Sequence, residues 1–157
     1  MAMTHGYCPR GQRLIGRVPH GHYKTITSVA AITLGGVLCA EVGSGGGMSG
    51  AWFLSFVTET LSPLIGPGDV VVMDNLASHK VKGVREAIEA TGAAVMYLPA
   101  YSPDLNPIEN AFSKVKHLLR RAARRTIEKL QSAILRALRS VTAEDCSGFY
   151  QHCGYIL

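Results

Sequence analysis

Asp74 is the first residue whose type and position suit chemistry. It directly follows VVVM at 70–73, a continuous apolar run that predicts a short strand buried on both faces of a sheet. In open α/β sheets, ligands and catalytic groups collect beyond the carboxyl ends of such strands. The polar residues Asn75 and His79 follow closely in the chain. Position alone leaves two interpretations open: a catalytic carboxylate, or an Asp-Asn turn that ends the strand.

Glu109 is the second candidate, and it lies in the proline-rich stretch LPAYSPDLNPIEN at 98–110. Asn106 suits the N-cap of a helix and Pro107 its first position, which puts Glu109 at the third helical residue. From there a carboxylate can reach back to the Asn106 backbone as a capping box and interact with the positive helix end. Position alone favours this cap over a catalytic role. The prolines fix the direction in which the helix leaves the sheet, which suits accurate placement of one side chain.

The helix expected from about 107 to 125 has a basic face opposite its apolar stripe, and no acidic residue lies between Glu109 and Glu128. A solvated surface is the usual interpretation of such a charge run. A stripe of one sign beside an acidic site is also what contact with a phosphate backbone needs, so we favour DNA contact. The basic face consists of Lys114, Lys116, His117, Arg120, Arg121, Arg124 and Arg125.

The elements that must position these groups follow from the periodicity of apolar residues along the chain. The first two strands are expected to form a hairpin that turns at Gly35-Gly36, and the last two helices are amphipathic. The segment after Thr142 carries only a weak helical signal. This order predicts an α/β sandwich in a single domain over residues 1–157. Strands are expected at 23–34, 37–42, 70–73 and 93–98, and helices at about 50–65, 81–91, 107–125 and from Thr126 onward.

Composition indicates a globular protein from a reducing compartment. Hydrophobic residues make up 47% of the chain and charged residues 17%, which excludes a disordered protein. The four cysteines form no CxxC pair and are expected to be free thiols in the cytosol. The N-terminal residues have no apolar signal core, and Gly35-Gly36 interrupts the most apolar run, so no membrane association is expected. A net charge of +5 agrees with an acidic partner such as nucleic acid.

Two longer segments, VVVMDNLASHK at 70–80 and YLPAYSPDLNPIENAFSKVK at 97–116, resemble the catalytic domain of DDE transposases. The resemblance is closest to the bacterial insertion-sequence branch of the mariner-like superfamily. Thirty-four residues, 75 to 108, separate Asp74 from Glu109, which is the spacing typical of that branch. PRGQRL, PHGHYKT and PGDVVVMDN are similar to the same branch, so the resemblance extends over residues 5 to 140.

The resemblance implies a ribonuclease H-like fold, with three layers and a mixed sheet, and a site where three carboxylates hold two Mg²⁺ or Mn²⁺ ions. Such ions would activate water, and then a DNA 3′-hydroxyl, for attack on phosphodiesters. Carried over, Asp74 is the second acid and Glu109 the third, while Asn75, His79 and Asn106 are candidates for groups beside the ligands or facing DNA. The implied partners are transposon ends and target DNA, with a homodimer as a further expectation, in the cytoplasm at the nucleoid.

The sequence departs from the family at the first acid, which family members carry on the first, central strand. That strand precedes the segment similar to PRGQR, whereas no Asp or Glu occurs here before Glu41. Glu41 and Glu59 belong to the hairpin and the next helix, and Asp69 lies at the opposite end of the Asp74 strand. We therefore expect an N-terminally truncated catalytic domain that lacks the first strand and the family's helix-turn-helix region and is inactive by itself.

The missing strand would leave two neighbouring strands without a ladder partner. Three outcomes are open: residues near Arg13–Val18 fill the gap, the chain folds poorly alone, or an upstream polypeptide supplies the strand and its Asp. Functions other than a transposase fragment also stay open. They are a non-catalytic nucleic-acid-binding protein of the same origin, a different two-metal nuclease of ribonuclease H-like fold, and a domain in which Glu109 is only a helix cap.

Overall fold

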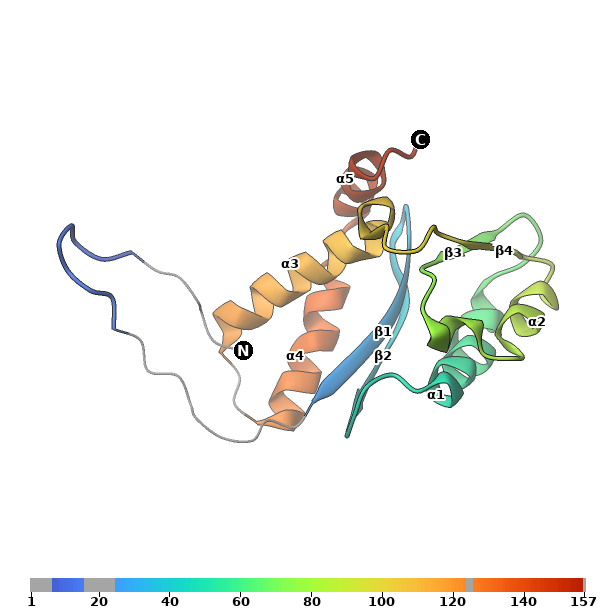
Figure 1. Cartoon of the computed structure of the whole chain (residues 1–157), viewed down its shortest axis with the longest axis horizontal. Helices are drawn as coiled ribbons and strands as arrows, with labels where there is room; N and C mark the ends of the chain where they lie inside the picture. The colour runs from blue at the N-terminus through green and yellow to red at the C-terminus, as the bar shows by residue number, and fades with distance from the viewer. Residues whose placement is uncertain (1–6, 16–24, 124–125, 157) are drawn as a thin grey trace.

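The computed structural model describes residues 7–15, 25–123 and 126–156. Within these ranges the chain forms two separate pairs of strands with helices packed around them (Figure 1). The elements in chain order are β1 (Ile26–Thr33), β2 (Gly36–Ser44), α1 (Gly50–Ser55), η1 (Phe56–Leu61), η2 (Ser62–Leu64), β3 (Val70–Met73), η3 (Ala77–Lys80), α2 (Val84–Glu89), β4 (Ala94–Tyr97), η4 (Pro103–Leu105), α3 (Pro107–Ala122), α4 (Ile127–Arg139) and α5 (Ala143–His152).

The first strand pair is the predicted antiparallel hairpin of β1 and β2. Its turn consists of Leu34 and Gly35, and Gly36 already begins β2. The φ of Gly36 is 125°, a conformation that favours glycine, which explains why a glycine follows the turn. Figure 1 shows this hairpin standing between α3 and α4 on one side and α1 on the other.

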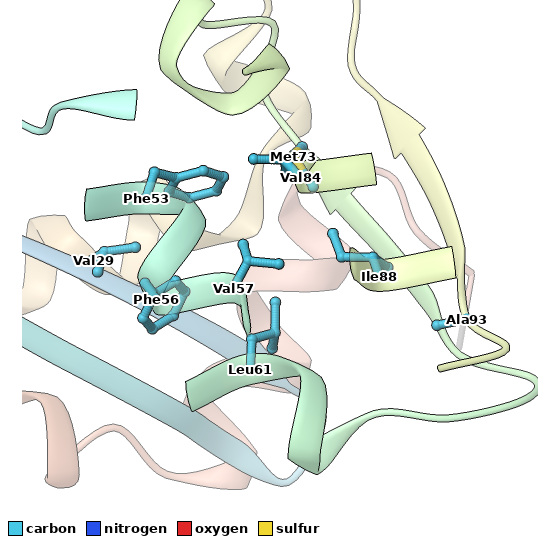
Figure 2. Close-up of a cluster of buried hydrophobic side chains, with 9 residues drawn as sticks. All are labelled: Val29, Phe53, Phe56, Val57, Leu61, Met73, Val84, Ile88 and Ala93. Carbon is cyan, nitrogen blue, oxygen red and sulfur yellow. The ribbon is translucent and has the colours of Figure 1, made fainter. Parts of the chain in front are cut away.

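The hairpin separates two hydrophobic cores because successive strand residues point to opposite faces. Val29 and Ala31 pack on the side of α1, whereas Ala30 and Ile32 pack on the side of α3 and α4. Figure 2 shows the first core, in which β1, α1, η1, β3 and α2 each contribute side chains. Its buried members are Val29, Phe53, Phe56, Val57, Leu61, Met73, Val84, Ile88 and Ala93.

The second strand pair is β3 and β4, which run parallel with Val70 opposite Ala94 and Met73 opposite Tyr97. No ladder joins this pair to the hairpin in the part of the chain that the structure describes. The predicted mixed sheet is therefore present as two halves. Arg13 to Ile15, the described part of the segment expected as a possible filler, are exposed and do not line the space between the halves. Residues 16–18 lie outside the described residues.

Three helical predictions need correction. The helix expected over 50–65 is α-helical only as far as Ser55, and then continues as the π-helical η1 and the short η2. The helix expected at 81–91 forms only over Val84–Glu89 as α2, because Gly83 before it has a left-handed backbone conformation. The weak signal after Thr142 becomes α5, a helix of ten residues.

Candidate metal site

Asp74 lies immediately after β3, as the sequence predicted. Its Oδ1 accepts the backbone N–H of Leu76 at 3.3 Å, so the residue also ends the strand in a turn. The same Oδ1 lies 2.5 Å from Nδ1 of His79. Among the described residues its Oδ2 has no hydrogen-bond partner, which leaves one carboxylate oxygen free to bind a ligand. Asp74 can therefore end the strand in a turn and also bind a ligand.

His79 comes from η3, and three contacts fix its position beside Asp74. Its ring lies against Phe53, with centroids 4.2 Å apart, and its backbone carbonyl accepts the hydroxyl of Tyr97 at 3.2 Å. Its Nδ1 approaches the Asp74 carboxylate closely but without hydrogen-bond alignment, so this buried nitrogen has no hydrogen-bond partner among the described residues. The short distance is therefore a contact and not a hydrogen bond.

Glu109 begins the second half of the site, where the turn η4 leads into α3. Asn106 is the N-cap residue and Pro107 is the first helical residue, as predicted. The backbone N–H of Glu109 donates to the Asn106 carbonyl at 3.1 Å, but no side-chain cap forms at this helix end. The capping-box interpretation of Glu109 is therefore wrong. The Glu109 side chain is exposed, and no residue that the structure describes forms a hydrogen bond with it.

Contacts with α5 and the residues after it stabilise the turn that carries Glu109. Tyr155 donates its hydroxyl to the Leu105 carbonyl at 3.1 Å, and Lys114 pairs with Asp145 across α3 and α5. Hydrogen bonding to Lys114 lowers the pKa of the Asp145 carboxyl. Sequence reasoning missed this support, although Thr142 and Asp145 form a capping box whose spacing in TAED was a readable helix start.

A single cavity of about 640 Å³ brings the two halves of the site together. Asp74 and His79 line it from the end of β3 and from η3, and Asn106 and Glu109 line it from the start of α3. Asn75, the remaining predicted neighbour, is exposed and does not line the cavity. Asp74, Glu109, His79 and Asn106 therefore line the same cavity, although the two segments that carry them are well separated in sequence.

Two tyrosines also line this cavity, and no pattern in the sequence predicts them there. Tyr150 donates its hydroxyl to the Ile32 carbonyl at 3.2 Å, while Tyr155 donates to Leu105. Burial raises the pKa of both phenols, so both hydroxyls remain protonated and act as donors. These bonds tie α5 to the hairpin and to the Glu109 turn at once.

A third carboxylate for the site is absent from the described residues, where no group of three His, Cys, Asp or Glu side chains could hold a metal ion. Glu41 accepts hydrogen bonds from Trp52 and Thr60 and is therefore engaged elsewhere. Glu59 is exposed on η1. Asp69 lines the cavity but precedes β3, at the opposite end of the strand from Asp74.

The basic face of α3 is largely exposed, and α3 begins beside the hairpin and runs away from β3 and β4 (Figure 1). Lys114 is the exception, because it is half-buried and paired with Asp145. Arg124 and Arg125 lie outside the described residues. The exposed members are Lys116, His117, Arg120 and Arg121. Across the described ranges, no helix has the length and apolar character needed to cross a membrane.

Comparison with known proteins identifies a family and a fold. The sequence model of the family described as DDE superfamily endonuclease matches residues 1–131. No curated protein matches the chain. The fold resembles the Mos1 transposase in its strand transfer complex, with a TM-score of 0.73 and 20% identity over 94% of this chain and 44% of that one.

Two further Mos1 structures are similar. The Mos1 mariner paired-end complex with Mn gives a TM-score of 0.66 and 18% identity, over 94% of this chain and 46% of that chain. The Mos1 transposase catalytic domain with raltegravir and Mg gives a TM-score of 0.60 and 19% identity, over 85% of this chain and 78% of that chain. The chain thus spans less than half of the Mos1 chains in these two DNA complexes. The likeness to the catalytic domain confirms the predicted ribonuclease H-like fold.

Proposed function

Because this chain belongs to the DDE superfamily endonucleases, an enzyme family, we propose that it is the catalytic domain of a transposase that cleaves DNA and transfers strands in insertion-sequence transposition. One observation carries this proposal: Asp74 and Glu109, with thirty-four residues between them, line the same cavity. The absence of a capping role for Glu109 supports a chemical role instead.

Asp74 and Glu109 have the properties that a Mg²⁺ or Mn²⁺ site needs. Both offer hard carboxylate oxygens, and in each case at least one oxygen is free of hydrogen bonds within the described residues. Two such ions are expected in the complete site. When bound, they would supply activation of water or of a DNA 3′-hydroxyl and would neutralise charge on the phosphodiester. The two carboxylates would hold the ions, and substrate phosphates and waters would complete the coordination.

We propose that His79 positions Asp74 rather than binding metal. Its ring is held by Phe53, and its Nδ1 contacts the oxygen of Asp74 that already accepts the Leu76 N–H. Both contacts fall on Oδ1, and Oδ2 has no hydrogen-bond partner among the described residues. Asn106, which is buried at the start of α3, would likewise fix the approach of Glu109. Asn75 is exposed and would face DNA.

The third carboxylate is proposed to come from an upstream polypeptide that also supplies the central strand. The division of the sheet into two pairs supports this, as does the lack of a third acidic ligand in the described part of the chain. Residues 1–157 alone are accordingly expected to be inactive, because two carboxylates hold two metal ions poorly.

Purified chain 1–157 is expected to bind DNA and Mn²⁺ without nicking or joining DNA. The assays measure conversion of supercoiled plasmid to its nicked form and joining of labelled oligonucleotides, each with Mg²⁺ and with Mn²⁺. If the chain nicks DNA and an Asp74→Asn variant does not, residues 1–157 are active without a further carboxylate. That result would overturn the expected inactivity and support Asp74 as a metal ligand. Failure to bind any divalent ion would instead remove Asp74 and Glu109 as ligands.

The proposed partners are transposon ends and target DNA, contacted through the basic face. Replacing Lys116, Arg120 and Arg121 by alanine is expected to reduce the salt dependence of DNA binding. The slope of log K against log salt should fall by about 0.9 for each phosphate that the variant no longer neutralises. The measurement is fluorescence anisotropy with labelled duplex DNA over a salt series.

A matched control comes from α4, where Arg136 and Arg139 are also exposed but belong to a different helix. Replacing both, together with the exposed Lys129 of the same helix, by alanine removes the same three positive charges and should leave the slope nearly unchanged. An equal loss of slope in both variants would mean that net charge alone matters. An unchanged slope in the α3 variant would remove the basic face as the DNA contact.

A non-catalytic nucleic-acid-binding protein derived from a transposase is the second candidate function. The exposed basic residues of α3 favour it, because they need neither metal nor the third carboxylate. Metal binding separates the two candidates, since only the catalytic domain requires it at Asp74 and Glu109. Either protein would act in the bacterial cytoplasm at the nucleoid, and a homodimer is the assembly to examine by sedimentation.

A further inference from the structure

The turn of residues 99–106 leads from β4 into α3 and sets where Glu109 lies. Most of this turn is exposed, including residues 99–101 and 103–105. The N–H groups of Leu105 and Asn106 donate to carbonyls of the same turn, at 3.2 Å and 3.1 Å. These bonds shape the turn but do not attach it to the rest of the protein, so contacts with another element are needed to hold it in place.

Among the described residues, one hydrogen bond reaches this turn from outside the turn and α3. It comes from the Tyr155 hydroxyl, which donates to the Leu105 carbonyl at 3.1 Å. Figure 1 shows that α5, the helix just before Tyr155, lies beside the start of α3 and beside the turn end of the hairpin. The structural features that position Tyr155 therefore also position the turn.

The end of α5 positions Tyr155 by a motif that depends on glycine. Gly154 follows the C-cap residue Cys153 and has a φ of 85°. Its N–H donates to the Gln151 carbonyl, and the N–H of Tyr155 donates to the Tyr150 carbonyl, both at 3.0 Å. These two bonds form a Schellman motif, which brings the residue after the glycine back against the last turn of the helix.

The motif brings two tyrosines together, and each is attached to a different part of the protein. The rings of Tyr150 and Tyr155 meet edge to face, with centroids 5.4 Å apart. Tyr150 donates its hydroxyl to the Ile32 carbonyl of β1 at 3.2 Å. We call the segment from Tyr150 to Tyr155 the tyrosine clamp. It connects the turn before Glu109 to β1.

The other half of the metal site is also held against β1. Val29 of β1 and Met73, the residue before Asp74, are both buried in the first core. Packing in that core therefore fixes Asp74 relative to β1. Because the tyrosine clamp fixes the turn before Glu109 relative to the same strand, β1 relates the two carboxylates to each other.

We propose that Tyr150 and Tyr155 are positioning residues for the metal site, because they fix the Glu109 turn to β1 and thereby set its place relative to Asp74. The proposal rests on the proposed function in that Asp74 and Glu109 hold a divalent metal ion. It goes further by making metal affinity depend on two hydroxyls that are not ligands. Such dependence is expected because metal ligands must be held within about 0.5 Å of their productive geometry.

Tyr155→Phe removes the hydroxyl and keeps the ring that packs on Tyr150. Mn²⁺ affinity, measured from free Mn²⁺ by electron paramagnetic resonance, should fall about threefold to tenfold, the effect of one hydrogen bond, with little change in melting temperature. Amide hydrogen exchange of Leu105 and Asn106 should become faster by a similar factor. Tyr101→Phe is the matched control, since Tyr101 is fully exposed in the same turn and its hydroxyl has no hydrogen-bond partner among the described residues.

Three further variants test the clamp as a unit. Tyr150→Phe, which frees its other end, should have the same effect on Mn²⁺ affinity as Tyr155→Phe. Gly154→Ala should also weaken Mn²⁺ binding, through backbone strain at a positive φ, because a Cβ there would meet no described atom within 4 Å. Gly148→Ala is the same change inside α5, where a Cβ also meets no described atom, and it should leave Mn²⁺ affinity unchanged.

Coupling to Glu109 separates positioning from a purely structural effect. In a Glu109→Gln background, Tyr155→Phe should cause no further loss of Mn²⁺ affinity, because the group that it positions is gone. In an Asp69→Asn background the loss should remain in full. An undiminished loss in the Glu109→Gln background would overturn the proposal, and so would an unchanged Mn²⁺ affinity in Tyr155→Phe itself.

The exchange measurement separates failure of this proposal from failure of the proposed function. If the unaltered chain binds no Mn²⁺, the proposed function is rejected, and amide exchange alone decides the clamp. Faster exchange of Leu105 and Asn106 in Tyr155→Phe would then retain the clamp as the attachment of the turn to β1. Unchanged exchange of these two amides would remove it.

Discussion

Replacing Asp74 by asparagine is expected to lower the affinity of the chain for Mn²⁺ at least about tenfold, with little change in melting temperature. Asparagine keeps the shape of the side chain, and its Oδ1 can still accept the Leu76 N–H that ends the strand. The substitution therefore removes the charge of the ligand without removing the turn. Free Mn²⁺ measured by electron paramagnetic resonance during a titration reports the affinity directly.

Asp69→Asn is the matched control for this measurement. Asp69 lines the same cavity and lies at the other end of β3, where its carboxylate accepts the Gly66 N–H at 2.8 Å. Its replacement removes the same charge from the same strand and should leave Mn²⁺ affinity almost unchanged. An equal loss in both variants would mean that Mn²⁺ responds to the general negative potential of the cavity and not to a defined ligand.

Glu109→Gln should produce a similar loss of affinity, and the two effects should not add. If Asp74 and Glu109 hold the same ion, the double variant loses little beyond either single variant, because residues with a shared partner are coupled. Full additivity would place the two carboxylates at independent ions. If Glu109→Gln instead lowers stability by about 1 kcal/mol and leaves the affinity unchanged, a helix-end role returns.

Replacing Phe56 by alanine is expected to have the largest effect on stability, a loss of about 3–5 kcal/mol in the free energy of unfolding. Phe56 is 2% exposed and lies in the first core between the hairpin and β3 (Figure 2). Its ring centroid is 6.2 Å from that of Phe53, which in turn holds His79. The total free energy of unfolding of a domain is about 5–15 kcal/mol. Such a loss therefore unfolds a large part of the population.

Urea denaturation followed by circular dichroism measures this effect as a shift in midpoint at unchanged slope. Leu64→Ala is the control, since Leu64 is 49% exposed at the end of the same helical region and should cost much less. A loss below about 1 kcal/mol for Phe56→Ala would mean that the first core closes around the space left by the ring. That result would contradict rigid packing of the core residues that line the cavity.

Much of the local structure was readable from the sequence because it depends on neighbouring residues. Ser49 caps α1 and Thr126 caps α4 as their residue types predict. The hairpin, β3, β4 and α3 also lie where apolar periodicity placed them. Helix α5 gave only a weak signal because its sequence is weakly amphipathic. Its stability comes from capping and from contacts with α3 and the hairpin.

The sequence by itself determined the two carboxylates, their positions at a strand end and a helix start, and the likeness to a transposase family. Only the tertiary structure decided that Asp74 and Glu109 line one cavity, that His79 contacts Asp74, and that Lys114 pairs with Asp145. It also decided that the described strands form two separate pairs. The physical reason is that strand ends and helix starts follow from local patterns, whereas contacts between distant segments depend on how the whole chain packs.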